Sequence, residues 1–580
     1  MGSNSFELRD IPEPDKIDTP WSHALPPAPR HAITSHFPGW KALVRLAERD
    51  PAHLSKIVSI YPRILPRKDC AQVSLDFTSP SSIGLAANYG LETLDSQSVS
   101  IRAFESNSTE GSKLYLYAVM FPLDKLFHVM TWWSDTGVAV SSRFAEHVPA
   151  NLSGLREVPI DATSVLNHDE TPHKVLCERI TYLLERASIT VREKKVQPSD
   201  VYLFQSGMAA IYNIHQYLQR LAGSSERKSV MLGVCFYETR HVLKKYGPGF
   251  QFFPIGSKMD EIEQFIRDEK ARGCPILSIW TECPSNPLLF TSDLPRLRQL
   301  ADDLHFALIV DDTDGGFCNV DVLPVADVVV TSLSKLFSGH ADVLAGSFVL
   351  NSSSRIYNDL KHIVDQDYVN DLYIGDARTL RHNSEDYLHR ATVVNKNVKV
   401  LTDWLYKRTK VEQGSVKRVY YPTVPHSQAH GNYDVFMRTP TTDFTPGYGC
   451  LFGLEFNSQE SAIKFYDNLH TYYGPHFAAH RTIALGFTYL IYKDDKELNM
   501  SDLGLSTAQI RISVGLEDSD TLLNIFKYAV MKADQVEDGR WSYKCMLDGA
   551  VALRIRRRIL ALHLTLHACR EHLRWFLETL

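Results

Sequence analysis

From about residue 175 the sequence alternates short apolar runs with longer amphipathic segments, and this alternation restricts the fold more than any other feature. The apolar runs are "DVYLFQ", "SVMLGVC", "PILSIWTE", "FALIVDD", "DVVVTSL" and "GSFVLN". Segments such as "MDEIEQFIRDEKARG" and "SDLPRLRQLADDLH" lie between several of them. Apolar strands separated by helices predict an α/β domain whose mostly parallel sheet is covered on both faces. In such a sheet a ligand binds at the carboxyl ends of the strands.

Changes in composition divide the rest of the chain into further regions. We expect a Pro-rich mobile arm over residues 1–38, an N-terminal region over 39–165, the large α/β domain over 166–380, a smaller α+β domain over 381–535 and a basic, leucine-rich helical tail over 536–580. The tail is interpreted as a helix that docks on a membrane surface or a partner, or as an extension without a function of its own. Its histidines lack the general base that HEXXH-type chemistry needs, so no metal site is expected.

The composition excludes several classes of protein. The net charge is −6 and 22% of residues are charged, without the basic face that nucleic-acid binding requires. The nine cysteines are scattered without a CxxC pair, a pattern typical of reduced thiols. The N-terminus is polar and acidic, unlike a signal or transit peptide, and no run is apolar enough to span a membrane. We therefore expect a cytoplasmic protein that binds neither nucleic acid nor the membrane interior.

Polar and small residues follow several of the apolar runs. Residues 206–208, "SGM", open a helix whose N–H groups and dipole suit a phosphate, although a tight turn would use the same residues. Asn286, between two prolines, is placed to aim an amide at a ligand, although "PSNP" is also an ordinary loop. Asp311, with Thr313 nearby, ends a buried run where a carboxylate needs a cation, magnesium included. No Gly-rich Lys-Ser/Thr loop accompanies it, which disfavours a phosphotransferase.

Lys335 ends the run "ADVVVTSL", where a long cationic side chain is rarely buried unless it is paired or reacts. An amine, a carboxylate and phosphate donors together complement pyridoxal 5'-phosphate (PLP), which uses the amine for covalent attachment and the carboxylate for its ring nitrogen. The phosphate donors would be Gly207, Met208, Ser332 and Ser334. Arg511, in "AQIRISVGLE", is either a surface arginine or the partner of a substrate carboxylate.

These residues carry a resemblance to a known family. The segment "DVVVTSLSKLFSGHAD" resembles the lysine motif of the Cys/Met-metabolism PLP-dependent enzymes, and "SGMAA", "ECPSNP", "VDDT" and "RISVGLED" match it in the same order. The resemblance covers roughly residues 175 to 530, and the upstream region is similar to that of fungal cystathionine γ-synthase-like proteins. It implies PLP-dependent fold type I, with a mostly parallel seven-stranded-type sheet and a smaller α+β domain. It also implies a homodimer or homotetramer with shared active sites.

The resemblance implies a role for each site residue. Lys335 would hold PLP and move protons, Asp311 would pair with the ring nitrogen, and Arg511 would bind the substrate carboxylate. Within the same subunit, Asn286 would contact the ring hydroxyl and Thr313 the cofactor, and the phosphate would be bound by Gly207, Met208, Ser332 and Ser334. From a neighbouring subunit, Arg143 or, as the second choice, Arg63 would reach the phosphate. Either Phe236 or Tyr237 would stack on the ring, and Tyr237 would supply a hydroxyl for proton transfer. Ala484 would stand in the substrate site where relatives usually carry serine.

The resemblance also implies a reaction. We expect γ-replacement on an O-acyl-L-homoserine, with cysteine as the nucleophile and cystathionine as the product. The alternatives are a different carbon or sulfur nucleophile in a specialised fungal pathway, a γ-lyase, and a non-catalytic scaffold descended from the enzyme.

Overall fold

The computed structural model describes residues 11–27, 30–54, 56–57, 75–77, 100–107, 113–120, 126–138, 140–147, 156–159, 171–223, 226–254, 258–424 and 430–537. The basic tail, from residue 538 onward, and Arg63 lie outside these ranges, so the expectations for them stay predictions. In the described part of the chain, no helix combines the length and the apolar character needed to cross a membrane.

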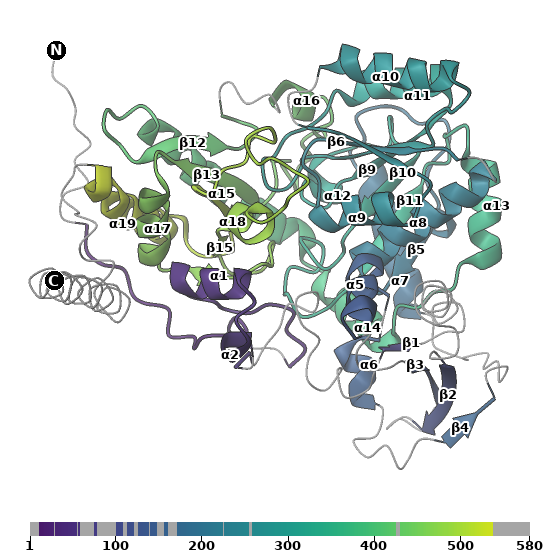
Figure 1. Cartoon of the computed structure of the whole chain (residues 1–580), viewed down its shortest axis with the longest axis horizontal. Coiled ribbons are helices and arrows are strands. Elements are labelled where there is room, and N and C mark those ends of the chain that lie inside the picture. Colours follow the sequence, from purple (N-terminus) through teal and green to yellow (C-terminus); the bar gives the residue numbers. More distant parts are fainter. Residues whose placement is uncertain are drawn as a thin grey trace, which may run out of the picture.

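A seven-stranded sheet forms the large domain, as the apolar runs predict (Figure 1). Its strands are β5 (Val201–Phe204), β6 (Ser229–Leu232), β7 (Phe250–Phe253), β8 (Ser278–Glu282), β9 (Ala307–Asp311), β10 (Val328–Thr331) and β11 (Gly346–Leu350). They lie in the order β5-β11-β10-β9-β8-β6-β7. Neighbours from β10 to β7 are parallel, and β11 pairs antiparallel with both β10 and β5. The prediction of a mostly parallel sheet is therefore confirmed.

Helices cover both faces of this sheet because side chains alternate along each strand. Leu308 and Val310 of β9 lie in one apolar cluster, whereas Ala307 and Ile309 lie in the other. The helices of this domain are α7 (Thr171–Glu185), α8 (Gly207–Ala222), α9 (Tyr237–Lys245), α10 (Met259–Ala271), α11 (Leu294–Leu304), α12 (Gly316–Asn319), α13 (Tyr357–Asp367) and α14 (Ile374–Asn383). Residues of α7 and α11 belong to the first cluster, and residues of α8 and α13 to the second. Burial on both faces explains why the strands read as unbroken apolar runs.

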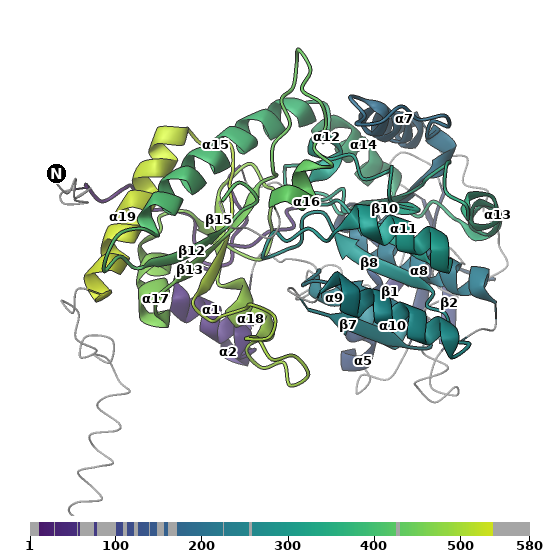
Figure 2. The same ribbon diagram turned by 90° about the horizontal axis from the view of Figure 1, so that it is seen from above.

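A second, five-stranded sheet forms the C-terminal domain. Its strands are β12 (Val416–Tyr420), β13 (Leu451–Phe456), β16 (Gln509–Ser513), β15 (Ile483–Leu485) and β14 (Tyr472–Tyr473), in that spatial order. The accompanying helices are α15 (Tyr387–Arg408), α16 (His430–Asp434), α17 (Gln459–Asn468), α18 (Phe487–Tyr492) and α19 (Ser519–Glu537). Figure 2 shows α15 and α19 lying side by side at the outer edge of this domain. The central strand β16 carries Arg511 toward the large domain.

The N-terminal segment is not the mobile arm that its prolines suggested. Ile33 N–H donates to the Ala341 carbonyl at 2.8 Å, and Phe37 N–H donates to the Tyr473 carbonyl at 2.9 Å. Leu25 and Phe37 are 2% and 4% exposed. Helix α1 (Trp40–Ala47), followed by α2 (Pro51–Leu54), packs on α17 and α18. The prediction of mobility is therefore wrong for residues 11–27 and 30–38, because these apolar side chains and backbone groups bind both domains.

Region 39–165 is likewise not one unit. While α1 and α2 lie against the C-terminal domain, a four-stranded antiparallel sheet lies beside the large domain (Figure 1). Its strands are β1 (Leu75–Phe77), β2 (Ser100–Asn107), β3 (Lys113–Met120) and β4 (Arg156–Val158), in the order β1-β3-β2-β4. Helix α5 (Leu126–Thr136) contacts α8 and α9, and α6 (Ser142–His147) contacts α14.

Candidate active site

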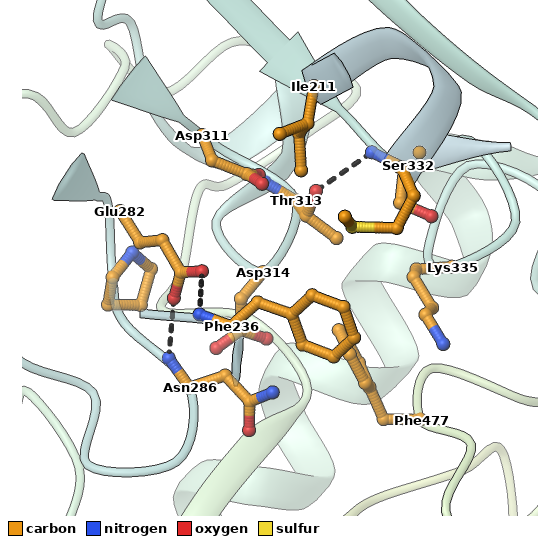
Figure 3. A pocket seen from close by; sticks show the side chains of 13 residues that line it. Ile211, Phe236, Glu282, Asn286, Asp311, Thr313, Asp314, Ser332, Lys335 and Phe477 are labelled. Atoms are coloured by element: carbon orange, nitrogen blue, oxygen red, sulfur yellow. Dashed lines mark hydrogen bonds between the residues drawn. The ribbon is translucent and has the colours of Figure 1, made fainter. Parts of the chain in front are cut away.

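A pocket opens at the carboxyl ends of β8, β9 and β10, where a parallel sheet with helices on both faces binds its ligands. Strand ends, the first turn of α8 and the loop before β15 all contribute to its wall (Figure 3). The lining residues are Gly207, Met208, Ile211, Phe236, Glu282, Pro284, Asn286, Asp311, Thr313, Asp314, Ser332, Lys335 and Phe477. Most residues predicted to bind a cofactor are among them.

Lys335 is buried at this pocket, at 7% exposure, four residues after β10 ends. Its Nζ donates to Nδ1 of His476 at 3.2 Å and lies 4.5 Å from the centre of the Phe477 ring. A ring face and a neutral imidazole nitrogen both stabilise an ammonium that has lost water. The amine is thus held inside the pocket, as the sequence predicted.

Two carboxyl groups stand side by side where β8 and β9 end. Glu282 and Asp311 are directly paired in the sheet register. Glu282 accepts from the backbone N–H of Phe236 at 2.6 Å and of Asn286 at 2.9 Å (Figure 3). Burial raises the pKa of Asp311 to about 6, and burial together with the charge of Asp311 raises the pKa of Glu282 well above its usual value. Of the two carboxyl groups, Asp311 has the smaller rise in pKa and is therefore the better suited to pair with a cationic ring nitrogen.

Two further acids follow Asp311 in the same loop. Oδ1 of Asp312 accepts from the Thr331 hydroxyl at 2.6 Å, and Asp314 lines the pocket (Figure 3). Burial raises the pKa of Asp312 to about 7 and that of Asp314 to about 8. Between about pH 4 and these values, the two carboxyl groups therefore keep protons in the folded chain that they would release in an unfolded chain.

Asp314→Asn is expected to change how stability depends on pH. The unfolded Asp releases its proton near pH 4 and the folded one near pH 8, so stability falls by up to about 1.4 kcal/mol per pH unit within this window. In cofactor-free protein the variant should therefore be more stable than the parent at pH 8, by on the order of a few kcal/mol, and nearly equal at pH 4. Urea unfolding at both pH values measures this. An equal difference at both would contradict the raised pKa.

The first turn of α8 lines the pocket, and its backbone N–H groups suit an anion. Backbone N–H groups of Gly207 and Met208 begin this helix, and the Ser206 side chain caps it by accepting from Ala209 N–H at 3.0 Å. A Cβ at Gly207 would lie 2.8 Å from Cβ of Ser332, so only glycine allows this approach. Ser332 N–H donates to the Thr313 hydroxyl at 2.8 Å, which ties the β10 loop to the β9 loop. Gly207, Met208, Thr313 and Ser332 thus lie where the sequence predicted.

Arg511 comes from the C-terminal sheet, is 4% exposed and lies beside the pocket, where it contacts the lining residues Asn286 and Phe477. Its guanidinium donates to Asn286 Oδ1 at 3.3 Å and to the Pro475 carbonyl at 2.6 Å. The guanidinium carbon also lies 4.5 Å from the centre of the Phe487 ring. A guanidinium fixed at the pocket edge suits a carboxylate ligand, which excludes the surface-arginine alternative.

The two candidate stacking residues lie in different surroundings. Phe236 lines the pocket, whereas the Tyr237 hydroxyl donates to Asp495 Oδ2 at 3.2 Å and its ring packs on Tyr492. The predicted catalytic role of Tyr237 is therefore not supported, because α9 begins at this residue and turns its side chain toward the C-terminal domain. The hydroxyl expected for proton transfer lies outside the pocket.

Tyr237→Phe is expected to leave kcat within about threefold of the parent value, because the hydroxyl that it removes bonds only to the pocket's surroundings. Steady-state kinetics of the purified enzyme test this. Phe236→Ala serves as the positive control and should weaken cofactor binding. A drop in kcat of more than tenfold in Tyr237→Phe would mean that the side chain turns inward during the reaction.

Three other predicted residues lie elsewhere. The Ser334 hydroxyl donates to the Ala345 carbonyl and accepts from Ala345 N–H, at 3.1 and 2.9 Å, so it is used in a loop contact. Ala484 is fully buried in β15 opposite Ile512. Arg143 pairs with Asp376 at 3.0 Å and Asp342 at 3.4 Å in its own chain. Ser334 and Ala484 do not line the pocket, whereas the role of Arg143 concerns a neighbouring subunit and stays a prediction.

Sequence reasoning missed several pocket residues. Glu282 ends an apolar run just as Asp311 does, so the same strand-end signal would have identified it. Asp314 follows Asp311 in the same loop. His476 and Phe477 come from a loop about 140 residues further along the chain than Lys335, and no local pattern connects them.

A buried lysine, an ionised strand-end carboxylate and a glycine-opened helix on a covered parallel sheet define a PLP-dependent enzyme of fold type I. Comparisons with known proteins identify the family. The family model for Cys/Met metabolism PLP-dependent enzymes matches residues 150–531. The chain therefore belongs to this family, and its cofactor is PLP.

Three of the individual relatives are from fungi. The chain is 32% identical to the cystathionine gamma-synthase-like enzyme iboG1 of Amanita muscaria, over 89% of this chain and 98% of that one. It is 34% identical to the alanine racemase ungC of Aspergillus violaceofuscus, over 73% and 74%. It is 35% identical to cystathionine gamma-synthase of Saccharomyces cerevisiae, over 64% and 61%. The crystal structure of cystathionine gamma synthase from Xanthomonas oryzae pv. oryzae shares the fold, with a TM-score of 0.51, 18% identity, and coverage of 64% of this chain and 90% of that one.

Proposed function

We propose that the protein catalyses γ-replacement on an O-acyl-L-homoserine, with cysteine as the nucleophile and cystathionine as the product. The observation that carries the proposal is that Lys335 and Asp311 line one pocket, and that Arg511, from the other domain, donates a hydrogen bond to Asn286 in the wall of this pocket. An amine that moves protons, a carboxylate for the ring nitrogen and a guanidinium for the substrate carboxylate are the groups that this reaction needs.

Lys335 would hold PLP, which would supply an electron sink for the negative charge that develops beside the substrate α-carbon. Arg511 binds the α-carboxylate, and Asn286, its hydrogen-bond partner, lies between it and the cofactor site. The Lys335 amine removes the Cα proton and then moves a proton at Cβ. The acyloxy group leaves Cγ as a carboxylate, and the cysteine thiolate forms the new C–S bond at the same carbon. Phe236 and Phe477 line the pocket with apolar rings, which keep water away from the amine.

A different nucleophile is the second candidate. The phenol of Tyr237 points away from the pocket, so proton transfer here relies on other groups than the resemblance implied. The relatives also carry different names, a cystathionine gamma-synthase, a cystathionine gamma-synthase-like enzyme and an alanine racemase, so the same scaffold accompanies more than one reaction.

A second subunit is proposed to complete the phosphate site. In the described part of the chain, the pocket lining includes no arginine. Arg143, which pairs with two carboxylates of its own chain, is the first proposed donor from a neighbour, and Arg63 is the second. Light scattering after gel filtration should give the mass of a homodimer or homotetramer, and Arg63→Ala should then weaken PLP binding without dissociating the assembly.

A substrate panel tests the reaction. O-acetyl-L-homoserine is supplied with cysteine, with other thiols or carbon nucleophiles, and alone, and the products are analysed by mass spectrometry. Cystathionine formed only with cysteine supports the proposal. Equal 2-oxobutanoate with and without cysteine would indicate a γ-lyase, and a different adduct would identify another nucleophile. L-Alanine converted to its D-enantiomer, with O-acetyl-L-homoserine unchanged, would contradict γ-replacement.

A further inference from the structure

The feature that the reaction does not yet explain is His476, the hydrogen-bond partner of the catalytic lysine. It is fully buried, and its Nδ1 lies 3.2 Å from Lys335 Nζ. Both neighbours of His476 in the chain take part in the site. The Pro475 carbonyl accepts from Arg511 at 2.6 Å, and Phe477 lies under the lysine amine. The imidazole is thus held by groups that belong to the substrate site.

The surroundings of His476 keep its ring neutral. Burial lowers its pKa well below the usual value, and the positive charges of Lys335 and Arg511, with His480 further away, lower it more. A neutral imidazole that accepts at Nδ1 carries its proton on Nε2. This ring therefore acts as a hydrogen-bond acceptor toward the amine and not as a second base.

We propose that His476 is a positioning residue for Lys335. The hydrogen bond from Lys335 Nζ to His476 Nδ1 fixes the direction of the amine during proton transfer at the substrate. This inference rests on the proposed function of Lys335 as the proton carrier. The hydrogen bond to His476 explains how the Lys335 amine stays oriented although the Tyr237 hydroxyl lies outside the pocket. A neutral amine with two hydrogens and a lone pair on a rotatable C–N bond loses rate when the lone pair is not aimed at the reacting atom.

Two neutral substitutions separate positioning from packing. The side-chain oxygen of His476→Asn lies where Nδ1 lies, whereas His476→Gln carries its amide to the position of Nε2. His215→Gln is the matched control, because His215 is equally buried, has a pKa lowered to about 4 by burial, and packs on Trp280 away from Lys335. Circular dichroism and the visible absorbance of bound PLP confirm that each holoenzyme is folded and loaded.

Two readouts are measured on the holoenzymes. The first is the exchange of the L-alanine Cα hydrogen in D2O, followed by NMR, which reports proton transfer whatever the final product is. The second is the pH midpoint of the visible absorbance of bound PLP, which needs no substrate. We expect His476→Gln to slow the exchange of the alanine Cα hydrogen roughly ten- to hundredfold, with unchanged affinity for alanine. The same variant should lower the pH midpoint of the absorbance by about half to one unit, because it loses the acceptor that favours a protonated Nζ. His476→Asn should stay within about fivefold, and His215→Gln should match the parent.

Other outcomes overturn the inference. Asn and Gln variants that both match the parent in rate and midpoint would show that the contact does not position the amine. Two variants that are equally impaired and poor in bound PLP would show a packing role only. If the parent forms no product from O-acetyl-L-homoserine, the proposed function fails, but the absorbance midpoints of the variants still decide the role of His476.

Discussion

Lys335→Ala is expected to lower kcat by at least about a thousandfold, because the variant loses both the covalent attachment of PLP and the base that moves substrate protons. Lys335 is the only lysine among the described residues that line the pocket. Bound PLP can be reduced onto the protein with borohydride, and the mass of the intact chain then reports attachment. The parent should gain the mass of the reduced cofactor, and the variant should not.

The matched control is Lys399→Ala. Lys399 lies on the exposed face of α15, where it pairs with Asp403 one turn further on. Removal of such a surface ion pair changes stability by less than about 1 kcal/mol and should leave kcat unchanged. Turnover retained by Lys335→Ala, with the cofactor attached at another lysine, would refute the site described above.

Arg511→Lys is expected to raise the KM for the amino-acid substrate by roughly a hundredfold or more, with a smaller effect on PLP binding. A lysine keeps the charge but loses the planar fork that binds a carboxylate with two parallel hydrogen bonds. Truncating one partner of a buried charged pair costs about 2–5 kcal/mol, which corresponds to thirtyfold or more in affinity. Steady-state kinetics over a wide range of substrate concentration measure the change.

Arg511 also has a structural role, so the experiment needs a second measurement. The side chain supports the Pro475 carbonyl and Asn286, and its loss could loosen the loop that carries His476. Thermal unfolding separates a fold defect from a binding defect. Arg418→Lys, on the exposed side of β12 in the same sheet, is the control and should match the parent in both measurements. An unchanged KM in Arg511→Lys would mean that another group binds the carboxylate.

The large sheet and its functional edge were predictable from sequence. Apolar runs such as "FALIVDD" and "DVVVTSL" become β9 and β10, because a strand buried on both faces needs apolar residues at every position. Asp311 and Lys335 were identifiable because a charged residue at the end of such a run is exceptional. The N-terminal segment was misjudged, since proline content does not reveal that Leu25 and Phe37 find partners in two domains.

The sequence alone therefore determined which strands form, in what order they occur, and which charged residues stand at their ends, because these depend on local composition and spacing. Tertiary structure decided which side chains enter the pocket. Phe236 and Tyr237 are neighbours in the chain, yet only Phe236 lines the pocket, because the start of α9 turns the two side chains in different directions. Likewise, His476 meets Lys335 only because the C-terminal domain folds against the sheet, and no local pattern records a contact between residues so far apart.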